Sequence, residues 1–229
     1  MAGGFHPPLE EYLEAIHALA EEGTTIIQAR LVERLGHSPQ AVSEMVRRLA
    51  SAGYLERRGR GVALTPLGQA RAESVVRKHR LAERFLVDVL GLAWDRAHDE
   101  AGRWEHVISD EVEARFVELL GHPTTCPHGN PIPGAPRDEA PQVPMADVVE
   151  GQQIRLARIT ERVETDRDVL AYLGEHGLVP GRRARVASRA PDGTVTLELD
   201  GVDGSRPATV AVGAAMCREL YVTDAPAAG

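Results

Sequence analysis

The feature that most constrains the fold of this 229-residue chain is a proline-rich segment between His122 and Pro144. This segment contains seven of the chain's 15 prolines. Proline fixes φ and has no backbone N–H, so this density excludes a regular helix or a central strand. We therefore expect a linker or an extended wrap here. Helical sequence patterns precede this segment and strand patterns follow it.

The residues after the prolines predict a small β domain. Short apolar or alternating runs at 154–159, 183–188, 194–199 and 208–212 are typical of strands. Pro-Asp-Gly at 191–193 indicates a turn between two of them. One helix is expected over 166–176, ended by Gly177. We predict a partly open barrel, similar to an SH3 domain, over residues 146–229.

The first 73 residues predict a winged helix-turn-helix. Apolar periodicity predicts helices at 9–22 and 27–35. A third helix opens with Ser38 as N-cap and Pro39 in its first turn, and ends at Gly53. Two short strands, 54–55 and 62–64, follow, and the Thr65-Pro66 pair starts the next helix. This order predicts a DNA-binding module, in a chain of the α+β class.

In such a module the second helix of the motif enters the major groove of DNA. Candidate residues for base contacts are Ser38, Pro39, Gln40, Ser43 and Glu44, because they start that helix. Candidates for phosphate contacts are Arg47, Arg48, Arg57, Arg58 and Arg60. The alternative is that the winged helix contacts another protein and that these arginines form a solvated face.

Histidine and glutamate recur at helical spacing in the region that follows, over predicted helices at 66–90 and 94–106. His79 and Glu83 are i and i+4, so both side chains can reach one ion. His98, Glu105 and His106 share one helical face, with Gly102 between them. His98 and His106 would lie roughly 12 Å apart, too far for one ion whose bonds are about 2.1 Å. The pattern predicts two metal positions, although a solvated His/Glu face is the alternative.

Composition limits the partners. The net charge of −8 argues against indiscriminate nucleic-acid binding but allows a local basic face. Two cysteines are too few for a disulfide framework, and we expect a reducing, cytoplasmic location. The sequence contains no run of 18 apolar residues, so we expect no membrane association. A further helix is expected over 110–120, within a helical unit at 74–145.

The whole arrangement resembles the diphtheria toxin repressor family of metal-dependent transcriptional regulators. The similarity is most specific in three segments: Arg77–Asp88, Trp104–Val107 and Gly129–Gly134. The resemblance implies a homodimer that binds Mn²⁺ or Fe²⁺, then binds palindromic operators on double-stranded DNA, and represses metal-uptake genes. It implies no catalysis and no small organic substrate.

The resemblance also implies two metal sites in each subunit. The residues matching the first site are His79, Glu83, His98, Glu161 and Glu164. Those matching the second are Glu11, Gly102, Glu105 and His106. In the second site iron-responsive members carry Met and Cys where this chain has Glu11 and Gly102, and manganese-responsive members carry two carboxylates. Gly102 offers only a carbonyl and room for water, and such oxygen and nitrogen ligands favour Mn²⁺, with Fe²⁺ as the alternative.

Three questions stay open at this point. The Cys126-Pro127-His128 segment could supply another ligand, but we interpret it as a proline-rich turn with an ordinary buried cysteine. A metalloenzyme is an alternative, although the chain has no His-Glu-x-x-His motif or Gly-rich phosphate loop; a metal-storage protein is another.

We also expect a two-fold dimer through helices at 82–120. The apolar residues expected there are Leu86, Val89, Leu90, Trp104, Val107 and Ile108.

Overall fold

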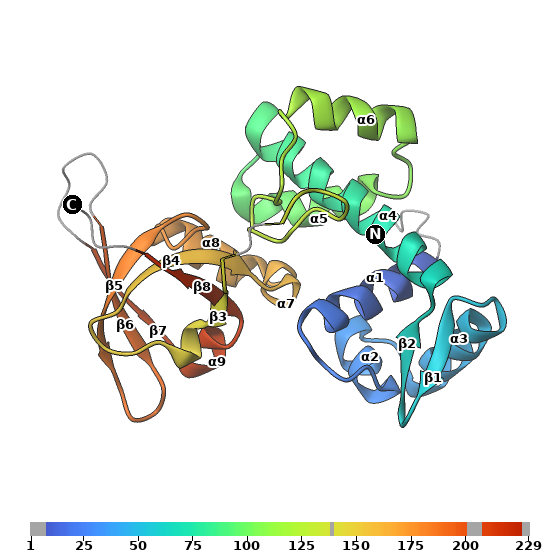
Figure 1. Cartoon of the computed structure of the whole chain (residues 1–229), viewed down its shortest axis with the longest axis horizontal. Coiled ribbons are helices and arrows are strands. Elements are labelled where there is room, and N and C mark those ends of the chain that lie inside the picture. The colour runs from blue at the N-terminus through green and yellow to red at the C-terminus, as the bar shows by residue number, and fades with distance from the viewer. Residues whose placement is uncertain (1–7, 138–139, 201–207, 226–229) are drawn as a thin grey trace.

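A computed structural model describes residues 8–137, 140–200 and 208–225 of the chain. The chain folds into three parts: a winged helix, a helical part and a β domain (Figure 1). Figure 1 shows the helical part beside both others, with α7 at the edge of the β domain that faces the other two parts. Within the described ranges, no helix is long and apolar enough to cross a membrane.

The winged helix forms as predicted. It comprises α1 (Pro8–Glu21), α2 (Gln28–Leu35), α3 (Pro39–Ser51) and the hairpin of β1 (Leu55–Arg58) with β2 (Gly61–Leu64). The core side chains come from all three helices: Leu13, Ile16, Leu31, Val42 and Leu49 are buried. Ser38 caps α3 by accepting from Ala41 N at 3.2 Å, and Thr65 caps α4 by accepting from Gly68 N at 3.1 Å.

The helical part contains α4 (Pro66–Arg84), α5 (Ala97–Trp104) and α6 (Asp110–Leu119). The α4 helix runs without a break from the wing into this part. It widens into a π-helical turn, η1 (Phe85–Val89), in which Leu90 N donates to Phe85 O at 3.1 Å. A 3₁₀ turn, η2 (Trp94–Arg96), precedes α5. The two predicted helices, 66–90 and 94–106, are therefore each shorter in α form, and Glu105 and His106 lie just beyond α5.

The first half of the proline-rich segment wraps along α4 instead of forming a free linker. The segment forms a few backbone hydrogen bonds of its own, such as that from Ile132 N to Thr124 O. Because its prolines have no N–H, several of its carbonyl groups need other donors. Three arginines on one side of α4 provide them. The pairs are Arg77 with the Pro133 carbonyl (2.7 Å), Arg80 with that of Pro131 (2.5 Å) and Arg84 with that of Thr125 (2.8 Å). The segment is thereby held against the helix that carries His79 and Glu83.

The β domain is one antiparallel sheet in the order β3-β8-β4-β5-β6-β7. Its strands are β3 (Val143–Pro144), β4 (Gln153–Ile159), β5 (Arg183–Arg189), β6 (Val195–Leu199), β7 (Ala208–Val212) and β8 (Leu220–Asp224). The helices are η3 (Met145–Asp147), α7 (Glu161–Glu164), α8 (Arg167–Glu175) and α9 (Ala214–Cys217). The predicted strands are present, but β8, which lies between β3 and β4, was not predicted.

Candidate metal centre

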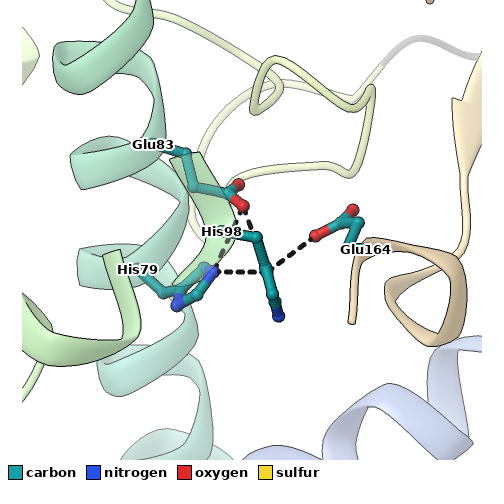
Figure 2. Close-up of side chains that lie close together, drawn as sticks. All are labelled: His79, Glu83, His98 and Glu164. Carbon is teal, nitrogen blue, oxygen red and sulfur yellow. Dashed lines mark hydrogen bonds and ion pairs between the residues drawn. The ribbon is translucent and has the colours of Figure 1, made fainter. Parts of the chain in front are cut away.

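Four side chains from three helices converge at one point (Figure 2). His79 and Glu83 lie one turn apart on α4, His98 comes from α5, and Glu164 comes from α7 of the β domain. His79 Nε2 lies 3.2 Å from Glu83 Oε1 and 3.0 Å from His98 Nδ1. His98 Nδ1 lies 3.2 Å from Glu83 Oε1 and 3.1 Å from Glu164 Oε2. This first cluster brings together four of the five residues expected in the first metal site.

The spacing of these atoms is that of ligands around one ion. Bonds of about 2.1 Å from a metal to nitrogen or oxygen place neighbouring ligand atoms about 3 Å apart when they meet at a right angle. The four distances in the cluster, from 3.0 to 3.2 Å, match such an arrangement. Glu83 is completely buried, and its Oε2 has no hydrogen-bond partner among the residues that the structure describes. A buried carboxylate oxygen without a donor fits a cation.

The proline-rich segment adds His128, which the sequence analysis interpreted as part of an ordinary turn. His128 is fully buried, and its Nδ1 lies 3.3 Å from Glu83 Oε1 and 3.7 Å from Glu164 Oε2. Cys126 also lies close enough to Glu83 and His128 for the three to share an ion. Gly129 (φ 89°) makes this packing possible, because a Cβ there would overlap the carbonyl oxygen of Ala157 in β4. The segment is a turn with a buried free cysteine, as interpreted from the sequence, and it also brings ligand-type side chains to the cluster.

A second cluster begins at the other nitrogen of the same His79 ring. His79 Nδ1 lies 2.5 Å from Glu105 Oε2 and 3.9 Å from Glu14 Oε1, and Glu14 belongs to α1 of the winged helix. His106 Nε2 lies 3.0 Å from Glu105 Oε1, and His106 Nδ1 lies 2.5 Å from Glu10 Oε2. The two expected sites therefore adjoin through one imidazole. The sequence analysis missed Glu10 and Glu14, which the acidic run of α1 could have indicated.

Glu11, Gly102 and Glu161 are less tightly placed than the other expected ligands. All three line a hollow of about 490 Å³ together with His79 and Glu105. Gly102 leaves space, because a Cβ built there would meet no atom within 4 Å. Glu161 lies 3.9 Å from the guanidinium of Arg80 and is outside the compact cluster around His98. The structure thus gives these residues access to the hollow without a close mutual contact.

The electrostatics of both clusters favour a cation. Burial alone would lower the pKa of His98, but hydrogen bonds with Glu164 and Glu83 raise it to about 10. Burial would raise the pKa of Glu105, yet His79 and His106 lower it to about 2. Burial, together with the charge of Glu105, raises the pKa of Glu14 well above its usual value. Carboxylates outnumber imidazoles here, so a divalent cation would balance charge that protons otherwise balance.

The residues expected to contact DNA lie on a separate face. Pro39, Gln40 and Glu44 are exposed on α3, and Ser43 is half-buried. Ser38 is exposed, although its hydroxyl group caps the helix. The arginines of α3 and the wing (Arg47, Arg48, Arg57, Arg58 and Arg60) are all exposed, and no ion pair neutralises them within the described residues. They leave exposed basic side chains on the later turns of α3 and on the wing.

A winged helix joined to buried His/Glu clusters defines the class of protein, a metal-responsive DNA-binding protein. Residues 5–63 match the N-terminal DNA binding domain of the iron dependent repressor family, and residues 65–134 match its metal binding and dimerisation domain. Residues 143–224 match the FeoA domain. The chain belongs to this family of metal-dependent transcriptional repressors, the family of the diphtheria toxin repressor. That membership confirms the expected class and excludes the enzymatic alternative.

Named relatives agree with this assignment. The chain is 43% identical over 204 residues to the iron-dependent repressor IdeR of Mycobacterium tuberculosis, covering 84% of this chain and 88% of that protein. It is 38% identical over 204 residues to the diphtheria toxin repressor of Corynebacterium diphtheriae, covering 85% and 89%. A solved manganese-dependent transcriptional repressor in complex with manganese superimposes with a TM-score of 0.84 at 34% identity, covering 95% of this chain and 100% of that one. The predicted three-part fold is confirmed.

Proposed function

We propose that this protein represses transcription of metal-uptake genes when Mn²⁺ or Fe²⁺ occupies the buried clusters, and that it binds palindromic operators as a homodimer in the cytoplasm. The proposal rests on the observation that the ligand-type side chains come from different parts of the chain. Glu14 belongs to the winged helix, His79 to α4 and Glu164 to the β domain. A cation bound by such residues would hold the DNA-reading part in one position relative to the rest. We also propose that the three domains of this repressor span residues 1–73, 74–145 and 146–229.

We assign two ions to each subunit. The first would be held by His79, Glu83, His98 and Glu164, with His128 as a further ligand. Glu161 and Cys126 lie near this site and are additional candidate ligands. The second would be held by Glu11, Glu105 and His106, with the Gly102 carbonyl, and with Glu14 beside them. The bound cation supplies positive charge that neutralises the converging carboxylates. Oxygen and imidazole nitrogen dominate the second set, which favours Mn²⁺ slightly over Fe²⁺.

The proposed dimer uses the outer surface of the helical part. Exposed apolar side chains gather there, and Val89, Leu90 and Val107 are 48%, 56% and 78% exposed. Leu86 and Ile108, which we also expected at the interface, instead pack in the chain's own small core with Ala82 and Ala101. The interface we propose is therefore narrower than expected. Leu67, Val112 and Leu119, which were not among the expected residues, are further exposed apolar side chains of the helical part.

Two reader helices are needed for a palindromic site, spaced by about one turn of DNA, roughly 34 Å. A dimer through the helical part would present one α3 from each subunit. Val107→Asp together with Leu90→Asp should give a monomer in light scattering and lose operator binding. Tyr172→Asp, an exposed position on the β domain, is the control. A dimer that persists with both aspartates present would overturn this interface.

The test of the function is operator binding with and without metal. A labelled duplex from upstream of the protein's own gene is titrated with the full chain in Mn²⁺, in Fe²⁺ under anaerobic conditions, and in EDTA. We expect tight binding with either ion and at least tenfold weaker binding in EDTA. His176→Ala, an exposed histidine at the end of α8, is the matched control for histidine variants. Metal binding without any metal-dependent retention of DNA would favour a storage protein instead.

A further inference from the structure

Trp94 lies against the turn that carries His128. The centroids of the two rings are 4.7 Å apart and tilted by 50°. The indole Nε1 donates to the Pro127 carbonyl at 3.2 Å, and the Trp94 carbonyl is 3.2 Å from His128 Nε2. Trp94 also starts η2, four residues before His98. It is therefore bonded to the turn on one side and linked through the chain to a ligand of the first cluster on the other.

The contact between the Trp94 carbonyl and His128 fixes the chemistry of the imidazole. A carbonyl oxygen only accepts, so Nε2 must carry the proton and donate. In the neutral ring Nδ1 then holds the free electron pair. That nitrogen is buried, has no hydrogen-bond partner in the described part of the chain, and faces Glu83 and Glu164. Hydrogen bonding of the second nitrogen to a carbonyl is the usual way in which a metal-binding histidine is oriented.

The opposite side of the indole touches the β domain. Trp94 packs against the main apolar core of that domain. A Cβ built on Gly174 of α8 would lie 3.6 Å from Trp94 Cε3, which is ordinary contact, so a longer side chain there would start at the surface of the indole ring. Nearby, Arg167 of α8 lies 4.0 Å from Asp99 of α5. The docking face of α8 thus presses directly on the residue that orients His128.

We infer that Trp94 is a positioning residue for the first metal site, and that docking of α8 on its indole ring holds His128 with Nδ1 toward Glu83 and Glu164. This inference rests on the proposed function, because it takes His128 to be a ligand. It makes the affinity of the first ion depend on packing between the helical part and the β domain. The second cluster, built from Glu105 and His106, does not touch Trp94.

Variants at two positions separate this role from general support of the fold. Trp94→Phe keeps an aromatic ring and loses the indole bond to Pro127, whereas Trp94→Ala removes both. The main-chain carbonyl of residue 94 that accepts from His128 remains in each variant, so these changes test the part played by the indole ring. Gly174→Leu disturbs the same contact from α8 without altering any ligand or the tryptophan. Trp104→Phe is the control, since the Trp104 indole donates to Glu100 at 3.0 Å, away from the His128 turn. All variants are made in the full chain, and folding is checked by circular dichroism and thermal unfolding.

The measurement is a titration with Co²⁺, whose visible absorption reports the ligands around the ion. Loss of an orienting partner of a metal ligand typically weakens binding about 10- to 100-fold. We expect Trp94→Ala and Gly174→Leu to weaken one Co²⁺ site by at least about tenfold and to change its spectrum. The other site should be unchanged, and Trp94→Phe should restore most of the affinity. Trp104→Phe should match the wild type.

A second readout uses the intrinsic fluorescence of Trp94. In the Trp104→Phe variant Trp94 is the sole tryptophan, since the chain has two. Its emission should change during the Co²⁺ titration with the same midpoint as the absorption change that Trp94→Ala alters. The inference is overturned if folded Trp94→Ala or Gly174→Leu keeps the wild-type spectrum and affinity. Failure of the wild type to bind two ions would instead overturn the proposed function.

Discussion

The hydroxyl group of Tyr12 lies 2.9 Å from Nδ1 of His37, and this contact joins the helix of the proposed metal ligands to the helix proposed to read DNA. Tyr12 is buried on α1 between Glu11 and Glu14. His37 directly precedes Ser38, the N-cap of α3. A shift of α1 on metal binding would therefore be transmitted to the start of α3 through a side-chain contact, in addition to the shared core.

Replacing Tyr12 by phenylalanine should weaken operator binding while leaving metal binding intact. A hydrogen bond of this kind contributes about 1 kcal/mol, which corresponds to about fivefold in affinity. Fluorescence anisotropy with labelled operator in saturating Mn²⁺ measures the change, and calorimetry counts the ions. Tyr172→Phe, on the exposed face of α8, is the control. A Tyr12→Phe protein with normal operator affinity would show that α1 and α3 are coupled only through their core.

His79 is expected to be more critical than any other ligand, because its Nε2 faces the first ion and its Nδ1 contacts Glu105, a proposed ligand of the second. His79→Ala should reduce the bound Mn²⁺ from two ions to fewer than one and abolish metal-dependent DNA binding without unfolding the protein. Glu83→Ala should remove only the first ion, although DNA binding should still be lost. Calorimetry with Mn²⁺ on both variants and on His176→Ala makes the comparison. Equal ion counts in His79→Ala and Glu83→Ala would contradict the shared imidazole.

Glu10 and Glu11 should differ in their effects, although they are neighbours on α1. Glu11 lines the hollow, so Glu11→Ala should raise the Mn²⁺ concentration needed for DNA binding and leave the first ion nearly unaffected. Glu10 contacts Nδ1 of His106 and forms an ion pair with Arg71, so we expect it to orient the His106 ring without binding the ion itself. Glu10→Gln, which keeps a hydrogen-bond acceptor, should therefore have the smaller effect. If Glu11→Ala leaves both ion count and operator affinity unchanged, Glu11 is not a ligand.

Gly102→Cys should change which metal the second site prefers. The position is helical and a new side chain meets no atom, so the substitution should be tolerated. A thiolate added beside Glu105 and His106 favours softer ions, so binding of Co²⁺ and Zn²⁺ should strengthen relative to Mn²⁺. Gly102→Ser is the matched control with a hard oxygen. Competition between Mn²⁺ and Co²⁺ measures the ratio, and an identical ratio in both variants would place residue 102 outside the ion's reach.

Metal binding should weaken as the pH falls, because protons and cations compete for the same groups. The pKa of His98 is raised to about 10, so below that pH the metal-free ring carries a proton that the ion must displace. Each proton released changes the apparent affinity by about tenfold per pH unit. Calorimetry at pH 6.5, 7.5 and 8.5 in buffers of different ionisation enthalpy counts the protons. The same affinity at all three values would mean that no ligand is protonated beforehand.

Much of the fold follows from local signals in the sequence. The pairs Ser38-Pro39 and Thr65-Pro66 start helices because each combines an N-cap with a proline that needs no donor. The strand at 208–212 was predicted to the residue. By contrast, β8 was missed, although its Tyr221, Val222 and Thr223 are residue types that favour strands. The end of α5 at Trp104 was also missed, because no glycine or proline marks it.

From residue spacing alone, the candidate site was predictable only where its residues share a helix, and the family resemblance supplied His98 and Glu164. His79 and Glu83 were found from their spacing, since residues four apart on a helix face the same way. Their contact with His128 depends on the path of the proline-rich segment. That path depends on arginine side chains that donate to carbonyl groups far away in the sequence. No short sequence pattern predicts such contacts. Likewise, the distance between Glu14 and His79 depends on how α1 packs against α4, which only the assembled core determines.

The division of ligands between α1 and α4 has a consequence for the genes themselves. If an ion favours one position of the winged helix, then DNA that favours the same position must raise the affinity for the ion by the same factor. An operator therefore acts as an effector of metal binding. A promoter with a strong operator would fill its repressor with metal at lower concentrations than a promoter with a weak one. The metal concentration at which each gene is repressed would then depend partly on the sequence of its operator. One repressor could therefore switch its targets off one after another as metal accumulates.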